Sequence, residues 1–186
     1  MLRLAMRRRQ ALLAGAALTL LALLRPWLES SMSMHMAIEL PALFGIGWLA
    51  SLWLRPASDA AFSQWNIAGF PALLAGGLVL GCWMLPVALD AAVLDWRIAT
   101  LKAASMVAAG FAIGWCWRRV AAVLQAFFLF NWCAMNLTAG LLYQNAPQQL
   151  CNVYLPDQQA TAGNALLAWA VVVLLGWLLR AGLTRD

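Results

Sequence analysis

The sequence predicts an all-helical bundle that crosses a membrane about six times, and three observations support this fold class. Of the 186 residues, 65% are hydrophobic and only 10% are charged, with a mean hydropathy of +0.79. Apolar runs of about 20 residues, the length that crosses the hydrocarbon core of a bilayer, recur along the chain. Arginines gather at the ends of these runs, and the eleven tryptophans are typical of membrane interfaces. A soluble domain has no use for so much apolar surface.

The predicted spans are separated by short polar or Pro-containing links, none of which is long enough to hold a separate soluble domain. The chain is therefore expected to form a single membrane domain over residues 1–186. Its start also resembles a signal peptide, with a basic region before an apolar one. No good small-x-small cleavage site follows, so we expect an uncleaved first helix. The predicted spans cover about residues 10–28, 32–54, 67–89, 99–117, 120–143 and 161–179.

The distribution of basic residues predicts the orientation of the spans. In a six-span arrangement most arginines fall on one side, while Arg25 and Arg97 fall in loops on the other. The positive-inside rule then places both termini in the cytoplasm. The net charge of +5 is therefore a topology signal, and it does not indicate nucleic-acid binding. We expect a multi-pass protein of the bacterial inner (plasma) membrane whose first partner is the lipid bilayer.

An uncommon cluster of soft side chains, SSMSMHMAIELP, stands at the outer end of the second predicted span. On a helix, Met32, His35, Met36 and Glu39 share one face, because residues three and four apart are neighbours. Met34 points elsewhere. Thioether sulfur suits Cu(I), and imidazole suits copper in either state. The cluster is therefore a candidate copper site. The alternative is that the methionines only fill apolar space and that His35 is a polar residue at a helix interface.

Glu39 is an acidic residue a turn or two inside a predicted span. Placing a carboxylate there costs free energy, so such a residue is by default taken as part of a functional site. Pro41 follows closely and is expected to free nearby backbone carbonyls. Three roles for Glu39 remain open on the sequence. It is a metal ligand, a partner that supports His35, or the counter-ion of Lys102.

Lys102 lies about one turn inside the fourth predicted span. It is expected either to snorkel outward or to pair with Glu39, Asp90 or Asp95. One histidine and seven acidic residues do not make a Ser-His-Asp set, a phosphate loop or a catalytic carboxylate pair, so we do not expect an enzyme. A small-solute transporter is also disfavoured, because no inverted repeat is found.

Small residues and cysteines have simpler interpretations. Gly110 and Gly114 form a GxxxG spacing, GFAIG, that predicts close contact between two helices. The four cysteines form no CxxC pair, so neither a redox motif nor a zinc knuckle is indicated. They are Cys82, Cys116, Cys133 and Cys151.

Three stretches together resemble one family. They are SMSMHMAIELPALFGIG, LPVALDAAVLDWRIATLKAASMVAAGFAIGWCW and LPDQQATAGNALLAW. The chain resembles the CtaG-type cytochrome c oxidase assembly proteins, also called caa3-type assembly factors, over about two thirds of its length. His35 and Met36 match the start of the family's H-M-x-x-H motif, and Glu39 stands in place of its second histidine. The family's paired histidines are absent from the middle stretch, which reads IATLKAA. The final motif is matched by Asp157, Gln158, Gln159, Ala162 and Gly163.

The resemblance implies a non-catalytic factor that handles copper or aids oxidase assembly at the periplasmic face. Its partners would be terminal oxidase subunits or a periplasmic copper carrier. His35 and Met36 would be primary ligands for Cu(I), with Met32, Met34 and Glu39 completing or supporting the site. Outer-face support would come from Asp157 and Gln158, which would order the outer loop, and from Asp90 and Lys102.

The alternative function is a non-catalytic membrane subunit or anchor of a respiratory complex without its own metal. The missing family histidines favour it. Bis-histidine haem ligation within one chain is excluded, because His35 is the only histidine.

Overall fold

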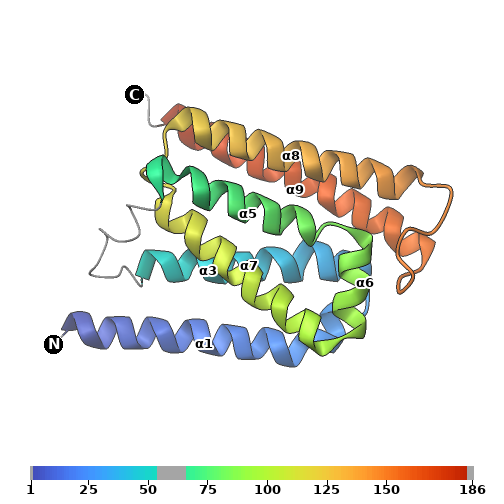
Figure 1. The fold of residues 1–186 in the computed structure, drawn as a ribbon, viewed down its shortest axis with the longest axis horizontal. Helices are drawn as coiled ribbons and strands as arrows, with labels where there is room; N and C mark the ends of the chain where they lie inside the picture. The colour runs from blue at the N-terminus through green and yellow to red at the C-terminus, as the bar shows by residue number, and fades with distance from the viewer. Residues whose placement is uncertain (1, 54–65, 184–186) are drawn as a thin grey trace.

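The computed structural model describes residues 2–53 and 66–183, and all the regular structure in these ranges is helical (Figure 1). The elements in chain order are α1 (Leu2–Leu28), α2 (Met32–Met34), the π-helical turn η1 (His35–Glu39), α3 (Leu40–Trp53), the 3-10 turn η2 (Ile67–Gly69), α5 (Phe70–Cys82), α6 (Pro86–Leu94), α7 (Trp96–Cys116), α8 (Ala122–Asn145) and α9 (Pro156–Leu183).

Within the described ranges, five helical segments are long and apolar enough to cross a membrane, and a bent pair provides up to one more. The prediction of a polytopic helical bundle is therefore confirmed. The bounds of these segments lie within a few residues of the predicted ones, because span length follows directly from hydropathy. The five segments are Arg9–Leu28, Met32–Trp53, Trp96–Cys116, Ala122–Asn145 and Pro156–Arg180.

The third predicted span, residues 67–89, is not one continuous helix. Its two parts, α5 and α6, are bent by 74° at a short break. Leu85 at the break is extended, with φ −76° and ψ 132°, and Pro86 opens α6. Proline disfavours the helical conformation of the residue before it but is well placed in the first turn of a helix. The chain therefore turns across the end of the bundle at α6 (Figure 1).

The helices form a bundle with α7 packed against both α3 and α5, and with α8 packed along α9. The beginning of α1 and the end of α9 lie at the same end of the bundle (Figure 1). Helix α6 and the link between α8 and α9 lie at the opposite end. The cytoplasmic placement of the termini stays a prediction.

The closest helix contact joins α3 to α7 through glycines. A Cβ added to Gly47 would overlap the carbonyl of Val107, and one added to Gly110 would overlap the carbonyl of Phe44. At Gly114 an added Cβ would overlap the hydroxyl of Ser51. The packing role predicted for Gly110 and Gly114 is thus confirmed. This close approach brings Lys102 of α7 to the start of the second span.

Candidate functional site

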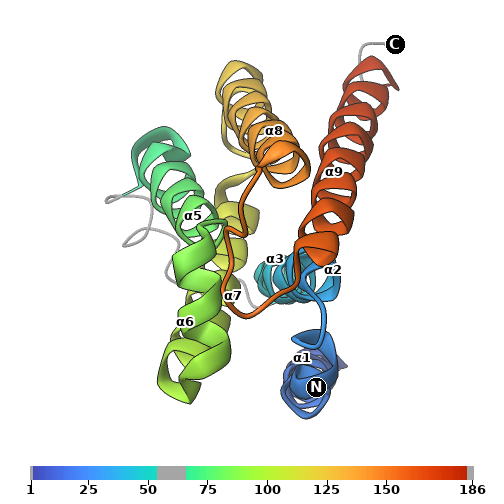
Figure 2. The same ribbon diagram turned by 90° about the vertical axis from the view of Figure 1, so that its right-hand side faces the viewer.

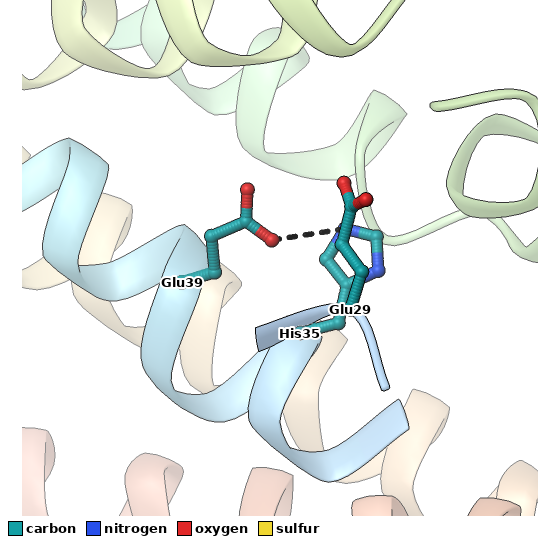
Figure 3. A group of neighbouring side chains, drawn as sticks. All are labelled: Glu29, His35 and Glu39. Carbon is teal, nitrogen blue, oxygen red and sulfur yellow. Dashed lines mark ion pairs between the residues drawn. The ribbon is translucent and has the colours of Figure 1, made fainter. Parts of the chain in front are cut away.

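The candidate site is a cluster of ionisable side chains at the end of the bundle opposite the beginning of α1. His35 and Glu39 come from η1, Lys102 from the second turn of α7, and Glu29 from the short link after α1. His35 is 0% exposed, Lys102 1% and Glu39 5%. The carboxyl groups of Glu29 and Glu39 and the ring of His35 point toward one another (Figure 3). The cluster is therefore built from three separate parts of the chain.

The ammonium of Lys102 occupies the centre of this cluster. Its Nζ lies 2.7 Å from Glu39 Oε1, 3.0 Å from Glu29 Oε1 and 2.8 Å from His35 Nε2. A lysine ammonium carries three hydrogens, so all three are used. The prediction that Lys102 pairs with Glu39 is confirmed, and snorkelling is not required.

Arg25 completes the charge balance. Its Nε donates to Glu29 Oε2 at 2.8 Å, and its Nη2 donates to the carbonyl of Ala92 in α6 at 2.9 Å. Two cations, Arg25 and Lys102, thus face two carboxylates, Glu29 and Glu39. Taking charges out of water costs several kcal/mol per ion unless they are paired and hydrogen-bonded, and this cluster meets both conditions.

The hydrogen bonds of Tyr154 set the tautomer of His35. The Tyr154 hydroxyl donates to the carbonyl of Glu29 at 3.1 Å, which uses its only hydrogen. His35 Nδ1, 2.8 Å from the same hydroxyl, must then donate its own hydrogen. We therefore assign a neutral imidazole whose Nε2 lone pair accepts from Lys102. The cluster as a whole has no net charge.

The local sequence explains the turn that carries the site. The side chain of Ser31 accepts from the backbone N–H of Met34 and caps the helix start at 3.3 Å. The backbone then widens into a π turn in which the Leu40 N–H bonds to the carbonyl of His35. Such π turns inside helices are rare and frequent at functional sites. The turn keeps Glu39 beside His35, with Oε2 3.5 Å from Nε2.

Pro41 has the predicted effect on the backbone. Because proline has no N–H, the carbonyl of Ala37 four residues earlier lacks its helical donor. The indole Nε1 of Trp169 in α9 donates to that carbonyl instead, at 2.8 Å. Helix α9 is thereby tied to the turn that carries His35 and Glu39.

Glu29, His35 and Glu39 also form a possible cation site. Each offers one ligand atom, and these atoms lie within 4.8 Å of one another. Glu39 Oε2 is buried and has no hydrogen-bond partner among the described residues. Two carboxylates and an imidazole fit a divalent cation such as Cu²⁺ or Zn²⁺. For a metal to bind, the Lys102 ammonium must leave the centre of the cluster.

The methionines predicted as ligands lie in apolar surroundings. Met32 and Met36 are 0% and 1% exposed and belong to the hydrophobic core, and Met34 is partly buried. Met36 also lines a cavity in the bundle. Their predicted role as Cu(I) ligands stays a prediction.

Side chains of Asp90 and Gln159 organise the loop between α8 and α9. Asp90 accepts from the backbone N–H of Asn152 at 2.8 Å and of Val153 at 3.4 Å, and its predicted role on the outer face stays a prediction. Gln159 Oε1 accepts from the backbone N–H groups of Leu150 and Cys151 at 2.6 and 3.0 Å.

The two residues predicted to order this loop are placed differently. Asp157 is exposed in the first turn of α9, and Gln158 is partly buried. The side-chain hydrogen bonds just described come instead from Gln159, the next residue of the same motif, and from Asp90. A surface carboxylate in the first turn still interacts favourably with the helix dipole.

Burial alters the acidity of two groups in the same loop. It raises the pKa of the Cys151 thiol to about 12, with a further contribution from the nearby Asp90 carboxylate. Burial also raises the pKa of Tyr154, and the charges of Glu29, Glu39 and neighbouring groups add to this effect. Both groups therefore stay neutral at ordinary pH, which is the state that the hydrogen bonds of Tyr154 require.

Three members of the cluster were missed or misread on the sequence. Glu29 stood in a short link, and Tyr154 lies 119 residues from its partner His35. Arg25 was taken as a topology signal, although its spacing of four residues from Glu29 is the signal of a helical ion pair.

Comparisons with known proteins find no relative. No protein-family model, curated protein or solved structure matches the chain. The resemblance to oxidase assembly proteins therefore stays a prediction that rests on the three sequence stretches.

Proposed function

We propose that this chain is a metal-handling protein of the bacterial inner membrane that serves the assembly of a copper-containing terminal oxidase. The main observation in support of this proposal is that ligand atoms of Glu29, His35 and Glu39 lie within 4.8 Å of one another. The resemblance of the sequence to oxidase assembly proteins supplies the biological setting. No catalysis is assigned to the chain.

In this proposal Lys102 is an internal cation that holds the site until a metal arrives. With Lys102 in place the two carboxylates are neutralised and the buried cluster is stable. A divalent metal would take over that neutralisation. Glu29, His35 and Glu39 would hold it, and the unpartnered Oε2 of Glu39 would supply a further donor atom. Binding and the release of Lys102 would therefore be coupled.

The donor atoms decide which metal fits. Oxygen and imidazole donors suit divalent copper or zinc, and copper binds more tightly in the general order of affinities. Binding of Cu(I) would require thioether sulfur, and Met36, which is buried and adjacent to His35 in sequence, is a candidate. Comparing the affinities for Cu²⁺ and Cu(I) thus distinguishes binding by the carboxylates and His35 from binding that uses a methionine.

A second candidate function has an observation of its own. The charges of the cluster already sum to zero without a metal, and Lys102 uses all three of its hydrogens within it. Such a cluster also suits a purely structural role in a membrane subunit or anchor of a respiratory complex. Removal of Lys102 separates the two functions.

The test is a metal titration of the purified protein with Cu²⁺, Zn²⁺ and, under reducing conditions, Cu(I). The wild type should bind about one equivalent of a divalent metal, and His35→Ala should weaken binding by at least about tenfold. Lys102→Met should tighten binding by about tenfold or more, because it leaves two buried carboxylates that only an added cation can neutralise. Met36→Leu should change the affinity for Cu(I) alone.

The matched control is Arg97→Met, which removes an exposed cation from the same helix. It should leave metal affinity unchanged. A Lys102→Met protein that binds no metal, and whose melting temperature metal does not raise, would exclude the metal site and leave the structural role. In the host, loss of oxidase activity on gene deletion should be restored by the wild type and not by His35→Ala.

A further inference from the structure

An apolar cavity of about 310 Å³, partly open to the surroundings of the bundle, lies next to the charged cluster but separate from it. Its lining comes from α3, α5, α7, α8 and α9 together with η1. Figure 2 shows the five α-helices from the end of the bundle that carries α6. Met36 follows His35 in sequence, and Met106 is one helical turn beyond Lys102. The cavity thus begins where the charged cluster ends. Its volume is at the lower end of the range for small-molecule sites, about 300–1,000 Å³.

Asn136 supplies the one amide in this lining. It stands in the middle of α8 and is 1% exposed. Its Nδ2 donates to the carbonyl of Trp132 at 2.8 Å, whereas its Oδ1 has no partner among the described residues. Because a carbonyl only accepts, the nitrogen must face Trp132, and the orientation of the amide is settled. The group left over is an acceptor.

A buried acceptor without a donor is unfavourable, because it has lost its hydrogen bonds to water and gained none in return. In a membrane helix this cost is not relieved by bulk water. An occupant of the cavity that carries a hydroxyl would satisfy Oδ1. A ketone, ether or quinone would not, because it offers acceptors alone.

One wall of the cavity is a continuous run of aromatic rings. Trp48 lies 5.5 Å from Trp117 and 6.1 Å from Phe44, and Trp117 lies 6.2 Å from Phe128, measured between ring centroids. Aromatic rings pack well on one another in tilted and edge-to-face arrangements. Methionine sulfur, here from Met36, Met84 and Met106, also packs favourably against aromatic rings. The wall therefore favours an aromatic guest over a purely aliphatic one.

We propose that this cavity binds an uncharged alkyl-substituted phenol or hydroquinone, whose hydroxyl donates to Asn136 Oδ1 and whose ring packs on the aromatic wall. The site takes the reduced, hydroxyl-bearing form and discriminates against the oxidised quinone. The bilayer is the source of such a ligand, because molecules of this class dissolve in lipid. No part of this site depends on metal binding.

The test uses tryptophan fluorescence, since four tryptophans line the cavity: Trp48, Trp117, Trp132 and Trp169. The purified protein in detergent is titrated with a decyl-substituted hydroquinone, its dimethyl ether and the corresponding quinone under anaerobic conditions. The hydroquinone should quench the fluorescence saturably at one site. The ether and the quinone should bind about tenfold more weakly, the effect of losing one buried hydrogen bond.

Two variants decide whether Asn136 is responsible. In Asn136→Leu the preference for the hydroquinone over the ether should disappear, and the ligand-free protein should melt no lower than the wild type because an orphaned acceptor is removed. Asn131→Leu, an exposed amide on the same helix, should keep the preference. Val173→Phe, which fills part of the cavity, should weaken all three ligands.

Equal affinity of the wild type for hydroquinone and ether would overturn the proposal, as would an unchanged preference in Asn136→Leu. Absence of saturable quenching would overturn it as well, and would leave water as the partner of Asn136. These outcomes are independent of the metal titration.

Discussion

The Nζ of Lys102 lies 2.7 Å from Oε1 of Glu39, and both side chains are buried, at 1% and 7% exposure. This ion pair joins α7 to the start of the second span. Of the roles that the sequence left open for Glu39, the structure shows that of counter-ion to Lys102. The carboxylate also lies beside His35. In the proposed exchange of Lys102 for a metal, the same carboxylate becomes a ligand.

The first prediction concerns the coupling of this pair. Lys102→Met and Glu39→Gln should each lower the free energy of unfolding by about 3–5 kcal/mol, because each leaves buried charge uncompensated. The double variant should lose clearly less than the sum, with an interaction of about 1–3 kcal/mol. Unfolding of the detergent-solubilised protein without added metal measures this. Asp157→Asn, at an exposed carboxylate, is the control and should stay within about 0.5 kcal/mol. Additive losses would show that the two side chains act independently.

The second prediction concerns the contact of α3 with α7. Gly47→Ala should lower the free energy of unfolding by about 3 kcal/mol, because the new methyl group overlaps backbone atoms of α7 and the helices must separate. Gly45→Ala in the same helix has nothing within 4 Å of the added Cβ and should be neutral or slightly stabilising. Equal effects of the two changes would contradict the close packing of these helices.

The third prediction concerns the carbonyl freed by Pro41. Trp169→Phe keeps most of the ring but removes the N–H that bonds to Ala37, so the carbonyl is left without a donor. The expected loss is about 1–3 kcal/mol of unfolding free energy. Trp96→Phe removes an indole that is 66% exposed and should have little effect. If the two variants were equally stable, the hydrogen bond would have no measurable role.

The fourth prediction concerns Cys151 and pH. The thiol is fully buried, whereas that of Cys82 is exposed. At pH 8 a maleimide should therefore label Cys82 rapidly and Cys151 only after unfolding. Cys82→Ser and Cys151→Ser identify the two products by mass.

The stability contribution of the same thiol should depend on pH in one direction. Its pKa rises from 9.0 to about 12 on folding. The unfolded state therefore loses this proton first, and stability falls as pH rises from about 9 toward 12, while below 9 it is unaffected. Relative to Cys151→Ala, the wild type should lose stability over that range. A constant difference between the two proteins from pH 8 to pH 11 would refute the raised pKa.

The sequence was a good guide to the spans because hydropathy and helix length are local properties. It was a poorer guide at Pro86, where an apolar run continues through a break in the backbone. The signal was present, since the residue before a proline avoids the helical conformation. Hydropathy alone does not register a change in backbone direction.

The candidate site was half predicted. The pairing of His35 with Glu39 follows from their spacing of four residues along one helix. Glu29 and Tyr154 were not predicted as members of the site. The sequence around Tyr154 gives no signal, and the signal for Glu29 is its spacing of four residues from Arg25. The orphaned acceptor of Asn136 was likewise invisible, since an asparagine in an apolar helix does not reveal which of its atoms find partners.

The sequence by itself therefore determined a helical membrane bundle, the approximate limits of most of its spans and the face shared by His35 and Glu39. All of these depend on residues close together in the chain. The tertiary structure decided that a lysine 67 residues from His35 occupies the centre of the cluster. It also decided that Tyr154 sets the histidine tautomer and that the methionines lie among apolar side chains. Those outcomes depend on how the helices pack, and the glycine contact of α3 with α7 is what brings Lys102 close enough to neutralise both carboxylates.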